Sequence, residues 1–402
     1  MTYDVQRLRA RVPALREGAA HFDGPGGTQI PDEVADAMDV TLRSAVSNRG
    51  RGTAAERRAD DIVTGARQAM ADLLGADPRG IVFGRSMTQI TMDIARTLAQ
   101  DWGPGDEIVV SRLDHDADVR PWVIHAERAG ATVRWAEFDP ATGELTPDDV
   151  LRHVGPATRL VAVTGASNLI GTRPDLPAIA AGVHEHGALL YVDGVHLTAH
   201  APVDVAAIGC DFYACSPYKF LGPHLGVLAA SPSLLERLHP DKLLPATNAV
   251  PERFELGTLP YELLAGVTAA VDVLADLVPD QPAGSTRRER ILRSMTALEE
   301  YEDDLHARMR EGLESIPGIR LYSNAKERTP TETFTIDGHD SDAISAFLAE
   351  RGVNAPASNF YALEVSRSLG LGDAGGVRVG LAPYSSAEDV DRLIAGLREL
   401  TS

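Results

Sequence analysis

The chain has 402 residues, more than one hydrophobic core usually fills, so two domains are expected. Hydrophobic residues make up 44% of the chain and charged residues 24%, which is an ordinary globular composition. The formal net charge of -20 argues against a nucleic-acid partner and against an anionic membrane surface, because both bind to cationic patches.

The two cysteines, Cys210 and Cys215, show no pattern of a disulfide framework, which favours a reducing compartment. Residues 1–18 carry scattered charges and lack the apolar core of a secretory signal peptide. No apolar run approaches the length of a membrane-spanning helix. We therefore expect a soluble protein of the cytoplasm.

An N-terminal segment with a short helix is predicted over residues 1–22, followed by a large domain over 23–280. Strands and helices alternate in the large domain, a pattern typical of a mostly parallel sheet with right-handed crossovers. Seven strands are predicted at 81–83, 107–110, 132–137, 159–164, 189–193, 212–215 and 225–229. Helices are predicted at 32–46, 54–74, 119–129, 178–186 and 261–277, with a further helix ending near Leu98.

The polar stretch 281–286 is predicted to be a hinge before a small C-terminal domain over 281–402. The expected elements are helices at 287–315, 341–351 and 387–400 and strands at 319–322, 333–336 and 377–381. The predicted fold class is thus α/β, with a mostly parallel seven-stranded sheet in the large domain and a small α+β C-terminal domain.

Reactive side chains follow the ends of two predicted strands. Asp193 ends one apolar run, and His196 follows three residues later. A second apolar run leads to Ser216 and Lys219. Ligands of open α/β sheets gather outside the carboxyl ends of the strands. We therefore predict that Lys219 holds an aldehyde cofactor as a Schiff base and that Asp193 pairs with the ring of that cofactor.

The neighbours of Lys219 suit an amine that captures a carbonyl group. Such an amine must be available unprotonated, which burial or nearby positive charge achieves by lowering its pKa. Most lysines are simply solvated, but Tyr218, Phe220 and Leu221 make an apolar surrounding for this one.

Pyridoxal phosphate needs a lysine, an acid for its pyridine nitrogen, an anion-binding site and a group that stacks on its ring. Ser86, Met87 and Thr88 follow a short predicted strand at the start of a helix, where backbone N–H groups favour a phosphate. A plain helix cap by Ser86 or Thr88 is the alternative. Ser216 could add a hydroxyl to this site, and His115 could stack on the ring.

Several motifs resemble those of the class V aminotransferases, which have the type I fold of pyridoxal-phosphate enzymes. The closest resemblance is to the cysteine-desulfurase-like branch. The motifs are FDGPGGTQIP, FGRSMTQ, SRLDHDADVRPW, SNLIGT, VDGVH, CSPYKFLGPH and RFELGT. The resemblance extends from about Phe22 to Leu397. It implies pyridoxal 5'-phosphate as cofactor, an amino acid as substrate, and a homodimer with active sites at the interface.

The resemblance also implies roles for single residues. Lys219 would form the Schiff base, Asp193 would bind the pyridinium and His115 would stack on the ring. His196 would reach the ring hydroxyl, where desulfurases more often have glutamine. Asn168 would lie near the same oxygen.

The phosphate of the cofactor would be bound by Ser86, Met87, Thr88 and Ser216. Tyr218, also expected to contact the cofactor, stands where desulfurases usually have the histidine of an SGHK motif, so this position departs from the family pattern. Thr258 would reach the phosphate in the neighbouring subunit. Arg378 would clamp the substrate carboxylate in a bidentate pair.

One departure from the family pattern bears on the reaction. Desulfurases that form a persulfide carry a nucleophilic cysteine shortly before the arginine, whereas residues 355–362 contain none. Cys210 and Cys215 lie in another part of the chain and are predicted to be core residues. The expected reaction is C–S bond cleavage by β-elimination on cysteine or an S-substituted cysteine, begun by Lys219 removing the Cα proton. An aminotransferase and an amino-acid racemase or epimerase share that first step and remain alternatives.

Three other interpretations are weaker. Ser216 and Lys219 match an SxxK motif, but the partner motifs SDN and KTG are absent. His196 and His200 are four residues apart, but no HExxH motif or acidic third zinc ligand accompanies them. A catalytically silent pyridoxal-phosphate-binding protein is the third. Substrate choice is expected to depend on side chains that include Arg49, Arg51, Asn359, Phe360 and Tyr361.

Overall fold

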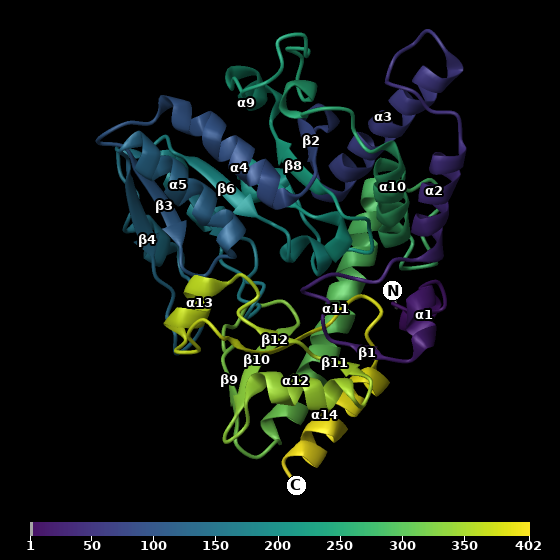
Figure 1. Cartoon of the computed structure of the whole chain (residues 1–402), viewed down its shortest axis with the longest axis vertical. Coiled ribbons are helices and arrows are strands. Elements are labelled where there is room, and N and C mark those ends of the chain that lie inside the picture. Colours follow the sequence, from purple (N-terminus) through teal and green to yellow (C-terminus); the bar gives the residue numbers. More distant parts are fainter. Residues whose placement is uncertain (1–2) are drawn as a thin grey trace.

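In the computed structural model, which describes residues 3–402, the chain forms one large and two small β-sheets (Figure 1). The large sheet has the strand order β2-β8-β7-β6-β5-β3-β4. Its strands are β2 (Ile81–Gly84), β3 (Glu107–Ser111), β4 (Thr132–Ala136), β5 (Thr158–Thr164), β6 (Leu189–Asp193), β7 (Phe212–Cys215) and β8 (Gly226–Ala230). Only β8 runs against its neighbours. The predicted α/β fold with a mostly parallel seven-stranded sheet is confirmed.

Helices cover both faces of the large sheet. Successive strand residues point to opposite faces, so Leu190 and Val192 of β6 join one hydrophobic cluster while Tyr191 joins the other. The helices on the first face are α3 (Ala54–Leu74), α7 (Leu176–Glu185) and α10 (Tyr261–Ala275). Those on the second face are α4 (Met87–Leu98), α5 (Arg120–Ala129) and α9 (Pro232–Arg237). The result is a three-layer arrangement in which the sheet is buried on both sides.

Local sequence signals set the ends of these helices. Thr53 caps α3 and exchanges hydrogen bonds with Glu56, which satisfies backbone groups that the first turn leaves free. Gly75 ends the same helix at φ 66, a conformation that glycine adopts without steric cost. The predicted bounds 54–74 of this helix agree with the structure.

Shorter elements connect these layers. The remaining helices of this part are α1 (Val5–Arg9), α2 (Asp32–Arg43), α6 (Pro147–Leu151) and α8 (Val205–Ile208). The 3-10 helices are η1 (Pro13–Glu17), η2 (Pro78–Gly80), η3 (Ala99–Asp101), η4 (Asp116–Asp118), η5 (Leu197–Ala199), η6 (Pro217–Lys219) and η7 (Glu252–Phe254). Among the residues described, no helix is both long and apolar enough to cross a membrane.

The C-terminal part contains an antiparallel sheet with the order β12-β13-β10-β9. Its strands are β9 (Ile319–Leu321), β10 (Thr331–Ile336), β12 (Ala357–Ser358) and β13 (Gly376–Gly380). The helices here are α11 (Arg287–Glu314), α12 (Ser341–Ala349), α13 (Leu363–Ser368) and α14 (Ala387–Leu400). Helix α11 joins the two parts, since Ile291 and Met295 pack in the cluster of the large sheet while Met309 and Leu313 pack with the small sheet (Figure 1).

A segment near the N-terminus of the chain packs with the C-terminal part. Strand β1 (Ala20–His21) pairs in parallel with β11 (Val353–Asn354), and Ala20 and Phe22 belong to the hydrophobic cluster of the small sheet. Residues 20–22 therefore pack with the C-terminal part, whereas Tyr3, Leu8 and Val12 belong to the hydrophobic cluster of the large sheet. The predicted domain bounds at residues 22 and 280 remain predictions.

Candidate active site

A cavity of about 750 Å³ lies where β5, β6 and β7 end. It is lined by Asn168 after β5, Asp193 at the end of β6, and Ser216 after β7. Of the twelve predicted site residues, those that line it are Ser86, Met87, Thr88, His115, Asn168, Asp193, His196, Ser216, Tyr218, Lys219 and Arg378. The fold thus brings together segments that are far apart in the sequence, including Arg378 from the small sheet.

Lys219 and Asp193 line the cavity, and the pKa of each side chain differs from its ordinary value. Burial, together with the positive charge of Arg378, lowers the pKa of the Lys219 amine to about 7, while Asp193 acts in the opposite direction. Burial raises the pKa of Asp193 to about 6, although its Oδ1 accepts a hydrogen bond from the Val195 amide at 2.9 Å. Lys219 Nζ donates a hydrogen bond to the Pro25 carbonyl. Near neutral pH the lysine therefore has an appreciable fraction of free amine.

The turn between β2 and α4 opens onto the same cavity. Ser86 caps α4 by accepting a hydrogen bond from the Gln89 amide at 3.1 Å, so the predicted alternative of a helix cap is present. The first amides of a helix, here those of Met87 and Thr88, have no acceptor within the helix and can bind an anion. Gly226 lies against this turn. A Cβ atom added to Gly226 would lie 2.5 Å from the Met87 nitrogen, so only glycine fits at this position.

Both histidines of the cavity are held neutral. Burial, with the charges of Lys219 and Arg378, lowers the pKa of His115 to about 4. His115 Nδ1 accepts a hydrogen bond from the Ala117 amide at 3.0 Å, which leaves the proton on Nε2. Burial also lowers the pKa of His196 well below its usual value.

His196 is oriented by two hydroxyl groups. Its Nε2 lies 2.9 Å from Thr329 Oγ1 and 3.1 Å from Thr331 Oγ1. Its Nδ1 is buried and has no hydrogen-bond partner among residues 3–402. A buried nitrogen without a partner in a cavity wall is a contact point for a polar ligand group.

Arg378 is a buried cation at the side of the cavity. Its Nη1 donates to the carbonyl of Asn168 at 3.0 Å, and the ring of Phe360 lies 3.6 Å from its guanidinium carbon. Burial lowers its pKa to about 9, while the charge of Asp23 acts in the opposite direction. Within the described residues, Arg378 Nε and Asn168 Oδ1 are buried without partners. The guanidinium therefore retains donors for a carboxylate.

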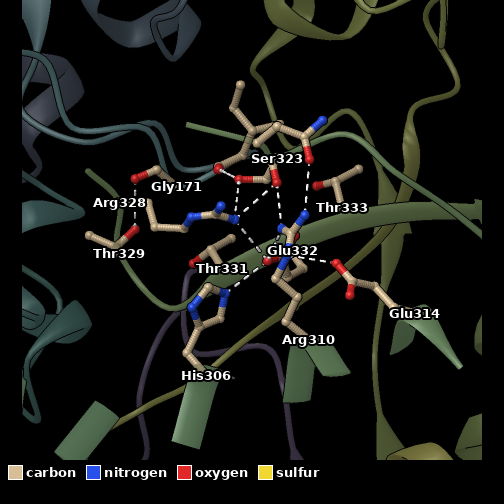
Figure 2. A network of polar contacts seen from close by, with 12 residues as sticks. Gly171, His306, Arg310, Glu314, Ser323, Arg328, Thr329, Thr331, Glu332 and Thr333 are labelled. Carbon is tan, nitrogen blue, oxygen red and sulfur yellow. Dashed lines mark hydrogen bonds and ion pairs between the residues drawn. The ribbon is translucent and has the colours of Figure 1, made fainter. Parts of the chain in front are cut away.

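A polar network surrounds Glu332 of β10, the strand that pairs with the strand of Arg378 (Figure 2). Thr333 of β10 pairs with Arg378 of β13, and the adjacent Glu332 is fully buried. Figure 2 shows the groups that meet at Glu332 Oε1, which are His306 Nε2 at 2.9 Å, Arg310 Nη1 at 2.9 Å and Arg328 Nη1 at 3.0 Å. Thr329, two residues before β10, donates from its Oγ1 to the Gly171 carbonyl at 3.2 Å, which ties the approach to this strand to the segment that carries Asn168.

Thr258 is the predicted site residue that does not line this cavity. It lines a second cavity of about 440 Å³ together with Gln89. Its predicted contact is with the phosphate in a neighbouring subunit, so that contact remains a prediction. Arg49 and Arg51 do not line the first cavity in this chain. Arg49 binds Asp60 at 2.8 Å and Glu252 at 2.9 Å instead.

Sequence reasoning missed an ion pair in the cavity wall. Arg120 Nη2 lies 2.9 Å from Asp116 Oδ1, and both residues line the cavity. Their spacing of four residues at the start of a predicted helix was a usable signal. Asp114 and Asp118 were also missed. Both are buried near Asp193, and burial raises the pKa of each carboxyl well above its usual value.

Comparison with known sequences assigns the chain to a family. The family model of the class-V aminotransferases matches residues 20–393. The chain belongs to the class V aminotransferase family. This family consists of pyridoxal-phosphate-dependent enzymes that act on amino acids and are typically dimeric. The resemblance predicted from the sequence motifs is confirmed.

Relatives of this chain include proteins with and without an assigned activity. It is 34% identical to an uncharacterized protein of Mycobacterium tuberculosis over all of both chains. It is 31% identical to the aminotransferase-like protein FGM3 of Gibberella zeae, over 98% of each chain. It is also 31% identical to a cysteine desulfurase of Klebsiella pneumoniae, over 100% of this chain and 99% of the relative.

Solved structures of cysteine desulfurases have the same fold. The cysteine desulfurase CsdA of Escherichia coli aligns over all of both chains with a TM-score of 0.87 and 27% identity. The apo cysteine desulfurase of Thermococcus onnurineus aligns over 100% of this chain and 98% of its own, with a TM-score of 0.90 and 25% identity. The cysteine-desulfurase-like branch is therefore supported by sequence and by fold.

The residues of the cavity fit pyridoxal phosphate by their own chemistry. Lys219 offers an amine whose pKa is about 7, and Asp193 offers a buried carboxyl. The start of α4 offers amides for a phosphate. His196 Nδ1 and Asn168 Oδ1 are buried polar atoms that have no partner in the described part of the chain. Such atoms are explained if a polar ligand completes their hydrogen bonds.

Proposed function

We propose that this member of the class V aminotransferase family is a pyridoxal-phosphate-dependent C–S lyase acting on cysteine or an S-substituted cysteine. The observation that carries the proposal is the position of Lys219. Its amine, with a pKa of about 7, lies in one cavity with the buried carboxyl of Asp193 and the buried guanidinium of Arg378. An amine near its pKa is suited to both imine formation and proton transfer at neutral pH.

The cofactor would be held by Lys219 through an imine, by Asp193 at its ring nitrogen, and by the Met87 and Thr88 amides at its phosphate. His115 would lie against its ring. When bound, pyridoxal phosphate withdraws electrons from the α-carbon of the substrate. The active unit is proposed to be a homodimer, which is typical of the family.

The residues of the chain would then act on the substrate as follows. Arg378 binds the α-carboxylate through its free donors and fixes the position of the α-carbon. Lys219, as free amine, takes the proton from that carbon. The Cβ–S bond breaks, and the sulfur leaves as a thiol after gaining a proton. With one water, the remaining three carbons become pyruvate and ammonium, so no oxidant or reductant is consumed.

The cysteines of the chain support elimination without a protein persulfide. Burial raises the pKa of Cys210 to about 12 and that of Cys215 further, so both remain protonated and unreactive at neutral pH. Neither lines the cavity. The loop before Arg378 contains no cysteine. Sulfur is therefore proposed to leave directly as a free thiol.

The proposal is tested by supplying the purified protein with pyridoxal phosphate and then with cysteine or S-substituted cysteines. Pyruvate, ammonium and thiol are expected in equal amounts. An aminotransferase would instead need a keto acid and would release no thiol. A racemase would exchange the Cα proton for solvent deuterium without breaking the C–S bond. Either of these results would replace the lyase assignment.

Asp193→Asn is expected to lower kcat by roughly 100-fold while leaving KM nearly unchanged. The amide has nearly the same shape as the carboxyl but cannot carry the negative charge that stabilises a protonated ring nitrogen. Steady-state kinetics with thiol release as the signal measures this split. Covalent attachment of the cofactor should persist, because Lys219 is intact. An unchanged kcat would show that Asp193 does not contact the ring.

A further inference from the structure

Phe360 and Tyr361 adopt an unusual backbone conformation at the edge of the cavity. Their φ angles are 51 and 60, so two successive residues with side chains lie in the left-handed region. This region is disfavoured for residues other than glycine. Such conformations persist where the surroundings impose them, and they occur preferentially at functional sites. Both residues line the cavity.

Hydrogen bonds from both sides hold this pair in place, and one of them runs from the Phe360 amide to Ser358 Oγ at 3.3 Å. Asn168 Nδ2 donates to the Phe360 carbonyl at 3.0 Å, and the Asp116 amide donates to the Tyr361 carbonyl at 2.7 Å. The Tyr361 amide donates to Asn359 Oδ1 at 2.9 Å. Two of these bonds come from segments that follow strands of the large sheet, so the conformation is fixed from across the cavity.

The two rings lie beside the groups proposed to bind substrate and cofactor. Phe360 stacks on the Arg378 guanidinium at 3.6 Å, which fixes the plane of the cation and leaves its edge for a carboxylate. The ring of Tyr361 lies 5.6 Å from the ring of His115, at an interplanar angle of 31°. Tyr361 is 74% exposed in the single chain and lines the cavity, so it is accessible to a ligand there.

Apolar side chains also line the cavity. Met92, Ala117 and Pro121 do so from α4, η4 and α5, and Ala117 directly follows Asp116, whose amide binds the Tyr361 carbonyl. The nearby cation of Arg120 is already paired with Asp116. The wall formed by Phe360, Tyr361 and these three residues is thus suited to a group without charge.

We propose that Phe360 and Tyr361 select amino acids with a bulky apolar group on sulfur, so that the product is an alkyl or aryl thiol rather than hydrogen sulfide. This inference rests on the proposed lyase. The Cα–H and Cβ–S bonds break, the thiol leaves with one proton, and one water converts the remainder to pyruvate and ammonium. Apolar and aromatic contacts with the leaving group are expected to raise kcat/KM by about 10- to 100-fold relative to cysteine.

The first measurement compares kcat/KM of the holoenzyme for S-benzyl-L-cysteine, S-carboxymethyl-L-cysteine and cysteine. S-benzyl-L-cysteine is expected to be the best substrate. Tyr361→Ala should reduce its advantage over cysteine about 10-fold, and Tyr361→Phe should keep the advantage because the ring is retained. Since Tyr361 is 74% exposed, neither substitution removes core packing.

The second measurement does not depend on turnover. Calorimetry with the holoenzyme gives the Kd of 3-phenylpropionate and of propionate, two carboxylates without the reacting amino group. The phenyl compound is expected to bind about 10-fold more tightly. Tyr361→Ala should remove this difference. Phe360→Ala should weaken both ligands, because Arg378 then loses the ring that fixes its plane.

The outcomes separate this inference from the lyase proposal. If cysteine is used as well as S-benzyl-L-cysteine, or if the preference survives Tyr361→Ala, selection by the rings is wrong. If S-carboxymethyl-L-cysteine is preferred and Arg120→Gln removes that preference, selection is by charge and the inference is also wrong. If no conjugate releases a thiol while 3-phenylpropionate still binds through Tyr361, the lyase is refuted and the selection by the rings is supported.

Discussion

Lys219→Arg is expected to abolish covalent attachment of the cofactor and to lower kcat roughly 10²- to 10⁴-fold. Arginine keeps a positive charge beside Asp193, but its guanidinium stays protonated in proteins. It therefore neither forms an imine nor accepts the Cα proton. Reduction with borohydride followed by mass analysis of the peptide containing residue 219 measures attachment, and thiol release measures kcat.

The chain offers a matched control, because it contains only three lysines, Lys219, Lys242 and Lys326. Lys242 is half-buried, lies outside the cavity and donates a hydrogen bond to the Ala246 carbonyl. Lys242→Arg should leave both attachment and kcat unchanged. A reducible imine that survives in Lys219→Arg would place the cofactor on another lysine and would refute the proposed site.

The groups at the ends of the parallel strands could be predicted from the sequence. Asp193 ends an apolar run, and the run before Ser216 is of similar character. In the sheet, Asp193 pairs with Thr164 of β5 and Ala214 of β7, so the ends of three neighbouring strands meet. Continuous apolar runs that end in polar residues, together with the parallel arrangement of the strands, are enough to bring such residues together. The burial that lowers the pKa of Lys219 follows from the same arrangement.

The part of the site formed by the C-terminal residues could not be derived from sequence pattern. Strand β12 is only two residues long, which is too short to show a period. The left-handed conformations of Phe360 and Tyr361 are imposed by Asn168 and the Asp116 amide, which are remote in sequence. Arg378 was predicted only through family resemblance. Its burial against Phe360 depends on tertiary packing.

The parallel pairing of β1 with β11 was missed for a related reason. Each strand has two residues, and they are more than 300 positions apart. Contacts of this kind depend on how the two parts of the molecule pack, and no local propensity indicates them. The N-terminal segment was therefore predicted as a separate piece, whereas Ala20 and Phe22 lie in the core of the C-terminal part.

Lys219→Met is expected to stabilise the cofactor-free protein, and the gain should depend on pH. Burial lowers the pKa of Lys219 from 10.5 to about 7. Between these two pH values the unfolded chain with Lys219 binds a proton that the folded chain does not. The free energy of unfolding of the unsubstituted protein therefore rises with pH in this range. Below pH 7 both states are protonated, and the folded state bears the full cost of a buried charge. Methionine fills a similar volume without that charge.

The expected gain in the free energy of unfolding is about 3 kcal/mol at pH 6, decreasing as the pH rises through 7 toward 10. Urea unfolding of the cofactor-free protein at a series of pH values measures it. Lys242→Met, which removes a lysine that lies outside the cavity, serves as the control for the general effect of replacing a lysine by methionine. A gain for Lys219→Met that is constant across this range would mean that Lys219 titrates normally. The free amine required for imine formation and proton transfer at neutral pH would then have to come from the bound cofactor rather than from the fold.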